Sequence, residues 1–165
     1  MKVVGFLLVL IGALALVSCA TSDGNATSVD TLSGYESWVK VNPETITGDA
    51  TGTLGRNVHQ GSTGFRDVYV NTSGAAVANG DSSGPFPVGS ILVKNSFKDD
   101  GGQMGDLADI TVMIKREAGY DPDNGDWEYM MLSDTMQVRA QGAINNCIAC
   151  HTAAAANDYA FLNYR

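Results

Sequence analysis

One stretch of the chain decides its fold: Ala108-Asp109-Ile110-Thr111-Val112-Met113-Ile114-Lys115. Polar and apolar residues largely alternate along it, which is typical of a β-strand that buries one face. The alternation puts three branched apolar residues on the same face: Ile110, Val112 and Ile114. The next residues, 119–126, are dense in turn formers, and a second, mostly apolar segment follows at 127–132. We therefore predict an antiparallel hairpin formed by 108–115 and 127–132.

More short strands are expected upstream of this hairpin. Phe65 to Asn71 and Ser90 to Lys98 alternate in the same way and contain aromatic and β-branched residues. Tyr35 to Val41 is a mixed segment, and we predict a first helix there. The body of the chain is thus a β-rich domain.

The composition excludes several classes of protein. The 165 residues carry 10 basic and 18 acidic side chains, and the formal net charge is −8. Proteins that bind nucleic acid cluster Lys and Arg to neutralise phosphates, whereas the cations here are few and scattered. The 17% of charged residues and the 19 glycines also argue against a coiled coil or a charged disordered chain. We predict one globular domain that does not bind nucleic acid.

The first residues resemble an export signal. Lys2 precedes an apolar run from Val3 to Val17, which is too short to span a bilayer comfortably but suits the core of a signal peptide. The run ends in Leu16-Val17-Ser18-Cys19, which resembles the bacterial lipobox, in which cleavage before the cysteine is accompanied by lipidation of its thiol. The alternatives are a short membrane helix or an ordinary signal with a chance cysteine. Ala20, rather than Asp, follows the cysteine, which favours sorting to the outer membrane.

This pattern divides the chain into three parts. We expect a lipoprotein signal peptide at 1–18, a flexible tether at 19–33 and a folded domain at 34–165. The tether is predicted because 21–33 is rich in Thr, Ser, Gly, Asn and Asp. A protein with this signal would be anchored by lipid to the bacterial membrane and would face the periplasm.

The chemistry of the domain is concentrated in Cys147-Ile148-Ala149-Cys150-His151, because C-x-x-C-H is the attachment signature of a c-type haem. On one helical turn, residues i, i+3 and i+4 share a face. Both thiols can then form thioethers to the haem vinyl groups while the imidazole points at the iron. Asn145 or Asn146 is expected to cap this helix. We predict a single covalent haem c.

Other uses of the two cysteines are a zinc half-site, a redox pair and a disulfide in a haemless scaffold. Zinc needs four ligands, and few good donors remain. A thioredoxin-like site would follow a βαβ unit, which the sequence does not contain. The motif lies close to the C-terminus and no methionine follows it, so a small His/Met electron carrier is disfavoured. The body also lacks the long amphipathic helices of four-helix cytochromes c′.

The order and spacing of several segments resemble the cytochrome P-460 family. The matching segments are Trp38, Phe65 to Asn71, Phe86 to Lys94, Gly119 to Pro122, Gly125 to Trp127, Cys147 to His151 and Asn157 to Phe161. That family includes hydroxylamine-oxidising cytochromes and the related cytochromes c′-β, which bind nitric oxide. The resemblance implies an α+β fold, a mostly antiparallel sheet with a few helices including a C-terminal haem-binding helix, and a homodimer.

The resemblance also implies roles for individual residues. His151 matches the proximal iron ligand, and Cys147 and Cys150 match the thioether anchors. Lys94 matches a lysine that forms an extra covalent bond to the porphyrin, although a strand lysine is otherwise a solvated charge. Arg66 matches a distal-pocket arginine that stabilises negative charge on a bound ligand, the alternative being a surface ion pair.

One departure from the family keeps two functions open. Oxidation of hydroxylamine removes protons, and the resemblance implies a carboxylate base shortly before the haem motif. Residues 135–146 contain no Asp or Glu, and Asp134 is the nearest. The chain is either an oxidoreductase for hydroxylamine or nitric oxide that passes electrons to a periplasmic partner, or a non-catalytic nitric-oxide-binding or electron-transfer protein. Possible sixth iron ligands are His59 and five methionines that more simply fill core gaps: Met104, Met113, Met130, Met131 and Met136.

Overall fold

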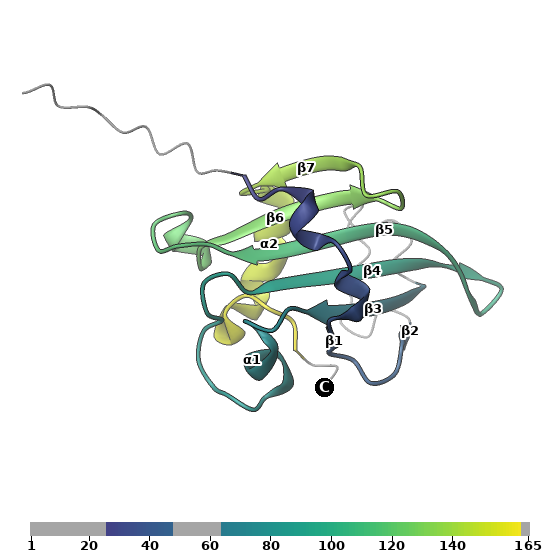
Figure 1. The fold of residues 1–165 in the computed structure, drawn as a ribbon, viewed down its shortest axis with the longest axis horizontal. Coiled ribbons are helices and arrows are strands. Elements are labelled where there is room, and N and C mark those ends of the chain that lie inside the picture. Colours follow the sequence, from purple (N-terminus) through teal and green to yellow (C-terminus); the bar gives the residue numbers. More distant parts are fainter. Residues whose placement is uncertain (1–25, 48–63, 163–165) are drawn as a thin grey trace, which may run out of the picture.

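The structure is a computed structural model that describes residues 26–47 and 64–162 (Figure 1). In this part of the chain the strands are β1 Val39–Lys40, β2 Ile46–Thr47, β3 Phe65–Val70, β4 Ile91–Asp100, β5 Gln103–Lys115, β6 Trp127–Ser133 and β7 Val138–Gly142. The α-helices are α1 Ala75–Asn79 and α2 Asn145–His151, and short 3-10 helices lie at Val29–Leu32, Tyr35–Ser37, Pro122–Asn124 and Thr152–Asn157. No helix within the described ranges has the length and apolar character needed to cross a membrane.

The described strands form one antiparallel sheet in the order β1-β3-β4-β5-β6-β7, with β2 also paired to β3. The predicted hairpin is confirmed as β5 and β6, with Ile110 opposite Leu132 and Ile114 opposite Glu128. Strand β5 begins earlier than predicted because it also pairs with β4 across a tight turn at Gly101 and Gly102, both of which have positive φ. The predicted α+β fold is confirmed.

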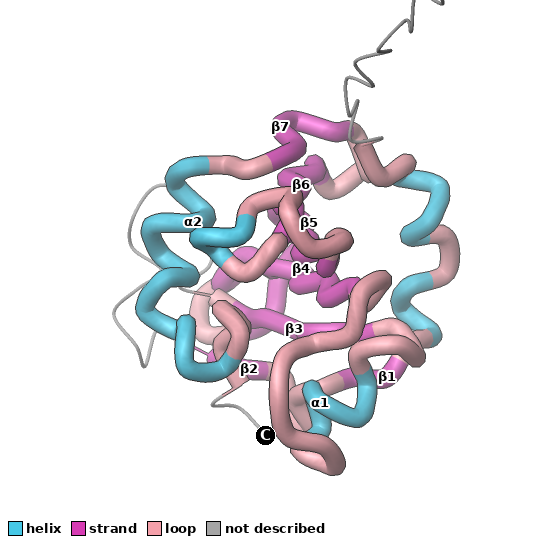
Figure 2. Tube along the Cα trace, turned by 90° about the vertical axis from the view of Figure 1, so that its left-hand side faces the viewer, coloured by secondary structure: helices cyan, strands magenta, loops and turns pink. Residues whose placement is uncertain are grey.

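The sheet lies between α2 on one side and the N-terminal 3-10 helices on the other (Figure 2), and each of its faces carries a hydrophobic cluster. Residues of alternating parity point to opposite faces of a strand, so each strand contributes to both clusters. The face that we call the N-terminal face carries Ile91, Val93, Ile110, Val112, Ile114, Met130 and Leu132 beneath the N-terminal segment. The opposite face, called the α2 face, carries Val68, Val70, Leu92, Met113, Trp127 and Tyr129, packed with Cys147 of α2 and with Ala160 and Leu162.

The N-terminal segment differs from the predictions. The expected flexible tether does not extend through Val29–Leu32, which is a 3-10 helix in which Leu32 is fully buried. Only Tyr35–Ser37 of the predicted first helix is helical, because Val39–Lys40 pairs with β3 instead. The difference arises because the apolar side chains of Leu32 and Tyr35 find the N-terminal face of the sheet, a partner that local composition does not reveal. The predicted signal peptide at 1–18, the predicted lipidation site Cys19, and His59 lie outside the described residues.

Candidate functional site

Helix α2 brings the C-x-x-C-H residues against the sheet. The helix follows β7 directly, and Gly142 turns the chain with a φ of 118°. Cys147 is buried in the α2-face cluster, and Cys150 is partly exposed one turn later. The capping residue is Ile144, whose carbonyl accepts from the Ile148 N–H, so the prediction that an asparagine caps the helix is wrong. The spacing prediction holds in that the two thiols and the imidazole are neighbours on one turn.

His151 is held by the segment that follows it. Its Nδ1 lies 2.7 Å from the carbonyl oxygen of Tyr159, and because a carbonyl can only accept, Nδ1 carries the proton. Its ring lies 5.4 Å from the ring of Tyr129 and 5.2 Å from that of Phe161, measured between centroids. Burial lowers the pKa of His151 to about 4, the bond to Tyr159 opposes this, and the Lys94 charge adds to it. The imidazole is therefore neutral, with the Nε2 lone pair available for a metal.

A cluster of polar side chains from the adjacent strands β3, β4 and β5 lies on the face of the sheet that α2 covers. Arg66 of β3 pairs in register with Ser96 of β4, and Ser96 pairs with Asp109 of β5, so the three share a face. Lys94 lies two residues before Ser96 and therefore on that face. The predicted site residues Arg66 and Lys94 are thus neighbours, and Arg66 is buried.

Lys94 acts electrostatically on the whole motif. Burial lowers its pKa to about 8; Asp109 and the two cysteines oppose this shift, whereas Arg66 adds to it. The same lysine lowers the pKa of Cys147, although burial outweighs it and brings that pKa to about 11. Lys94 therefore points toward α2 and is a weaker base than a solvated lysine, in contrast to the surface alternative.

Asp109 is the site residue that sequence reasoning missed. Burial raises its pKa, against the lowering effects of Lys94, Ser96 and Arg139. The Ser96 hydroxyl faces this carboxyl, yet among the described residues neither Ser96 Oγ nor Asp109 Oδ1 has a hydrogen-bond partner. The signal available in the sequence is a carboxylate inside the alternating segment 108–115, whereas the family resemblance points to the residues just before the haem motif. Asp134, the nearest of those, is exposed in the turn after β6.

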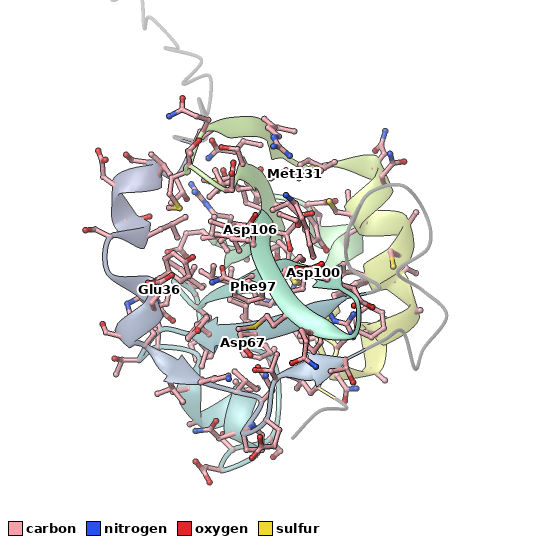
Figure 3. The ribbon with its side chains drawn as sticks, turned by 90° about the vertical axis from the view of Figure 1, so that its right-hand side faces the viewer. Glu36, Asp67, Phe97, Asp100, Asp106 and Met131 are labelled. Carbon is pink, nitrogen blue, oxygen red and sulfur yellow. The ribbon has the colours of Figure 1, made fainter. Side chains whose placement is uncertain are left out.

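The methionines divide between the two faces. Met131 lies on the α2 side of the sheet, whereas Glu36 lies on the opposite side with the N-terminal segment (Figure 3). Met113 is also on the α2 face, while Met130 and Met136 pack with the N-terminal face, and Met104 is exposed. Met130 and Met136 are thus directed away from α2, as the core-filling interpretation expects.

The residues present fit a haem. Three buried polar atoms on the α2 face have no hydrogen-bond partner among the described residues: Ser96 Oγ, Asp109 Oδ1 and Tyr129 Oη. Unsatisfied buried polar atoms are rare in folded proteins, and here they gather on the face where His151 offers Nε2. A further such atom, Asp121 Oδ2, lies in the loop between β5 and β6.

Comparison with known families agrees with this site. The family model described as Cytochrome P-460 matches residues 32–162. The chain belongs to the cytochrome P-460 family. This membership confirms the resemblance and supports a haem c cytochrome at the level of the family. A comparison with curated proteins gave no significant match.

Proposed function

We propose that the domain is a mono-haem c-type cytochrome in which Cys147 and Cys150 would hold the porphyrin and His151 would bind the iron. The observation that carries this is the bond from His151 Nδ1 to the Tyr159 carbonyl, which fixes the tautomer with Nε2 free. Each thiol would add across one vinyl group, with sulfur on one carbon and hydrogen on the other. This addition consumes no oxidant or reductant.

We further propose that the ligand is a small nitrogen species, hydroxylamine or nitric oxide. Bound haem supplies an iron that takes a diatomic or similarly small ligand and exchanges single electrons. Arg66 and Lys94 place positive charge where a ligand nitrogen or oxygen gains negative charge. Asp109 supplies a carboxylate that accepts a proton, which oxidation of hydroxylamine requires. This group supports the enzymatic class.

The alternative is a binding or electron-transfer protein without turnover. It is favoured by the absence of any carboxylate in 135–146 and by the exposure of Asp134. The two classes differ in whether Asp109 is close enough to the ligand to take its proton.

Location and partners are part of the same proposal. Covalent haem attachment in bacteria takes place outside the cytoplasm, which agrees with an exported chain lipidated at Cys19. We propose a periplasm-facing, outer-membrane lipoprotein that forms a homodimer and exchanges electrons with a periplasmic carrier.

The test is expression of the full chain together with a cytochrome c maturation system. Haem staining of the denatured protein and the mass of the peptide containing 147–151 should show covalent haem. Cys147→Ser with Cys150→Ser should abolish it, whereas Cys19→Ser should leave it intact and remove only the lipid. Unmodified thiols in the exported wild-type protein would contradict the proposal.

Ultraviolet-visible titration with nitric oxide and turnover of hydroxylamine then separate the two classes. Saturable nitric oxide binding with no hydroxylamine turnover would assign the binding class, and turnover would assign the enzyme.

A further inference from the structure

The chain folds back on itself immediately after the haem motif. Asp158 and Tyr159 have φ values of 51° and 64°, in the left-handed region that residues other than glycine rarely adopt. These two residues reverse the chain and return the Tyr159 carbonyl to His151 Nδ1. Such a backbone persists only where surrounding contacts hold it.

An ion pair supplies the first of these contacts. Lys115 Nζ, at the end of β5, lies 2.7 Å from each carboxylate oxygen of Asp158, and both side chains are almost fully buried. The Phe86 N–H donates to Asp158 Oδ2 at 2.7 Å, and Lys115 also donates to the Gly125 carbonyl at 2.8 Å. The Asp158 carboxylate is thus fixed from two separate elements.

Contacts from the β5–β6 hairpin fix the backbone of the same residues. Trp127 Nε1 donates to the Asp158 carbonyl at 2.8 Å, and the Tyr159 hydroxyl donates to the Asp123 carbonyl at 2.9 Å. Gly125 leaves room for the Tyr159 ring, because a Cβ at that position would lie 2.5 Å from Tyr159 Cδ2. The hairpin therefore determines where the Tyr159 carbonyl points.

We propose that Lys115 and Asp158 are positioning residues for the axial histidine, acting through the Tyr159 carbonyl. The inference rests on the proposed role of His151 as iron ligand. A carbonyl that accepts from Nδ1–H orients the ring and makes Nε2 a stronger donor. A stronger donor stabilises ferric over ferrous iron and lowers the reduction potential. Removing the ion pair between Lys115 and Asp158 should therefore raise that reduction potential.

The main test is Asp158→Asn in the haem-loaded protein. Asparagine keeps the size of the side chain and tolerates the left-handed backbone, so the change removes mainly the charge. We expect covalent haem to remain, the midpoint potential to rise, and the iron–histidine stretching frequency of the ferrous form to fall. A loss of about tenfold in the preference for ferric iron corresponds to a rise of about 59 mV for one electron.

A matched control is Glu128→Gln. It disrupts a second buried ion pair, in which Arg116 lies 2.7 Å from Glu128 on the N-terminal face. We expect Glu128→Gln to lower the unfolding free energy about as much as Asp158→Asn does, but to keep the wild-type reduction potential. This result would separate positioning of His151 from a general destabilisation of the fold.

Two further variants keep the proposal testable if Asp158→Asn does not fold. Trp127→Phe removes the indole donor to the Asp158 carbonyl while retaining an aromatic ring, and should shift the potential in the same direction. Lys115→Gln should also raise it, and Lys115→Arg should restore most of the wild-type value.

The outcomes distinguish the two proposals. Absence of haem from the wild-type protein would overturn the proposed function. Covalent haem with the same potential and the same iron–histidine frequency in wild type, Asp158→Asn and Trp127→Phe would overturn only the positioning role of Lys115 and Asp158.

Discussion

The same strands form both faces of the sheet, but the two faces differ in whether their buried polar groups are hydrogen-bonded. On the N-terminal face, the Tyr35 hydroxyl donates to Asn95 Oδ1 at 2.8 Å. Also there, Glu128 accepts from Arg116, Thr27 and Gln141. On the α2 face, Ser96 Oγ, Asp109 Oδ1 and Tyr129 Oη have no partner among the described residues. Among the described residues, the polar groups named on the first face pair with one another, whereas three on the second face stay unpaired, as the proposed haem site expects.

Two neighbouring cations show the same contrast. Lys115 and Arg116 are consecutive and so point to opposite faces. Arg116 binds Glu128 and thereby fixes the start of the domain at Thr27. Lys115 binds Asp158 and thereby fixes the segment that contacts His151. A buried ion pair supports the fold on one face and the site on the other.

The largest effect is expected from Asp109→Asn. If Asp109 takes the proton from hydroxylamine, its loss should slow turnover by about 100-fold or more while covalent haem is retained. Steady-state oxidation of hydroxylamine measures this. Asp134→Asn, at an exposed position, is the control and should retain the wild-type rate. Equal rates for Asp109→Asn and wild type would place the base elsewhere.

Leu32→Ala should affect stability without affecting the site. Leu32 is fully buried on the N-terminal face, and truncation of such a residue costs about 3 kcal/mol of unfolding free energy. Urea unfolding followed by far-ultraviolet circular dichroism measures the loss. The haem spectrum should be unchanged, and Val39→Ala, at a more exposed position, should be nearly neutral. A changed haem spectrum would show that the two faces are coupled.

Lys94→Met should raise the unfolding free energy, whereas Leu32→Ala lowers it. The folded pKa of Lys94 is about 8, below the ordinary 10.5, so between these values the unfolded chain binds the proton and the folded chain does not. Stability should therefore rise as pH increases through this window, and the destabilisation is fully present below about pH 8. Lys94→Met should stabilise the fold at pH 7 by roughly 1–3 kcal/mol and abolish this pH dependence.

Thermal unfolding at pH 7 and pH 10 measures the effect of Lys94→Met, with Lys98→Met on the exposed part of the same strand as control. The mass of the haem peptide shows whether Lys94 is bonded to the porphyrin, because a bonded Lys94 would carry its own peptide into the haem-containing fragment. A destabilised Lys94→Met variant would contradict the assignment of Lys94 as a cation whose burial costs the fold stability.

The smallest effect is expected at the tip of the β4–β5 hairpin. Lys98 Nζ lies 3.9 Å from Asp106, with side chains 62% and 92% exposed. Solvent and salt screen such a pair, so Lys98→Ala should change the unfolding free energy by less than about 0.5 kcal/mol. Urea titration at low and high salt checks this. A larger effect would assign the hairpin tip a contact within the fold.

Much of the fold was predictable because its signals are local. Alternation along 108–115 and the turn formers after it specify a hairpin whatever else the chain does. The N-terminal segment was mispredicted because its polar composition hides two buried residues, Leu32 and Tyr35. Their burial depends on a sheet face contributed by residues far along the chain.

The sequence by itself determined the hairpin, the family and the haem motif, since strand alternation and helical spacing are properties of neighbouring residues. Only the tertiary structure decided which carboxylate lies on the α2 face, because strand register places Asp109 opposite Ser96 and within the electrostatic reach of Lys94, while Asp134 is exposed. It also decided how His151 is oriented, because the Tyr159 carbonyl is held by Lys115 and Trp127 from another part of the chain. Contacts between residues distant in sequence form only when the sheet assembles, and no local pattern encodes them.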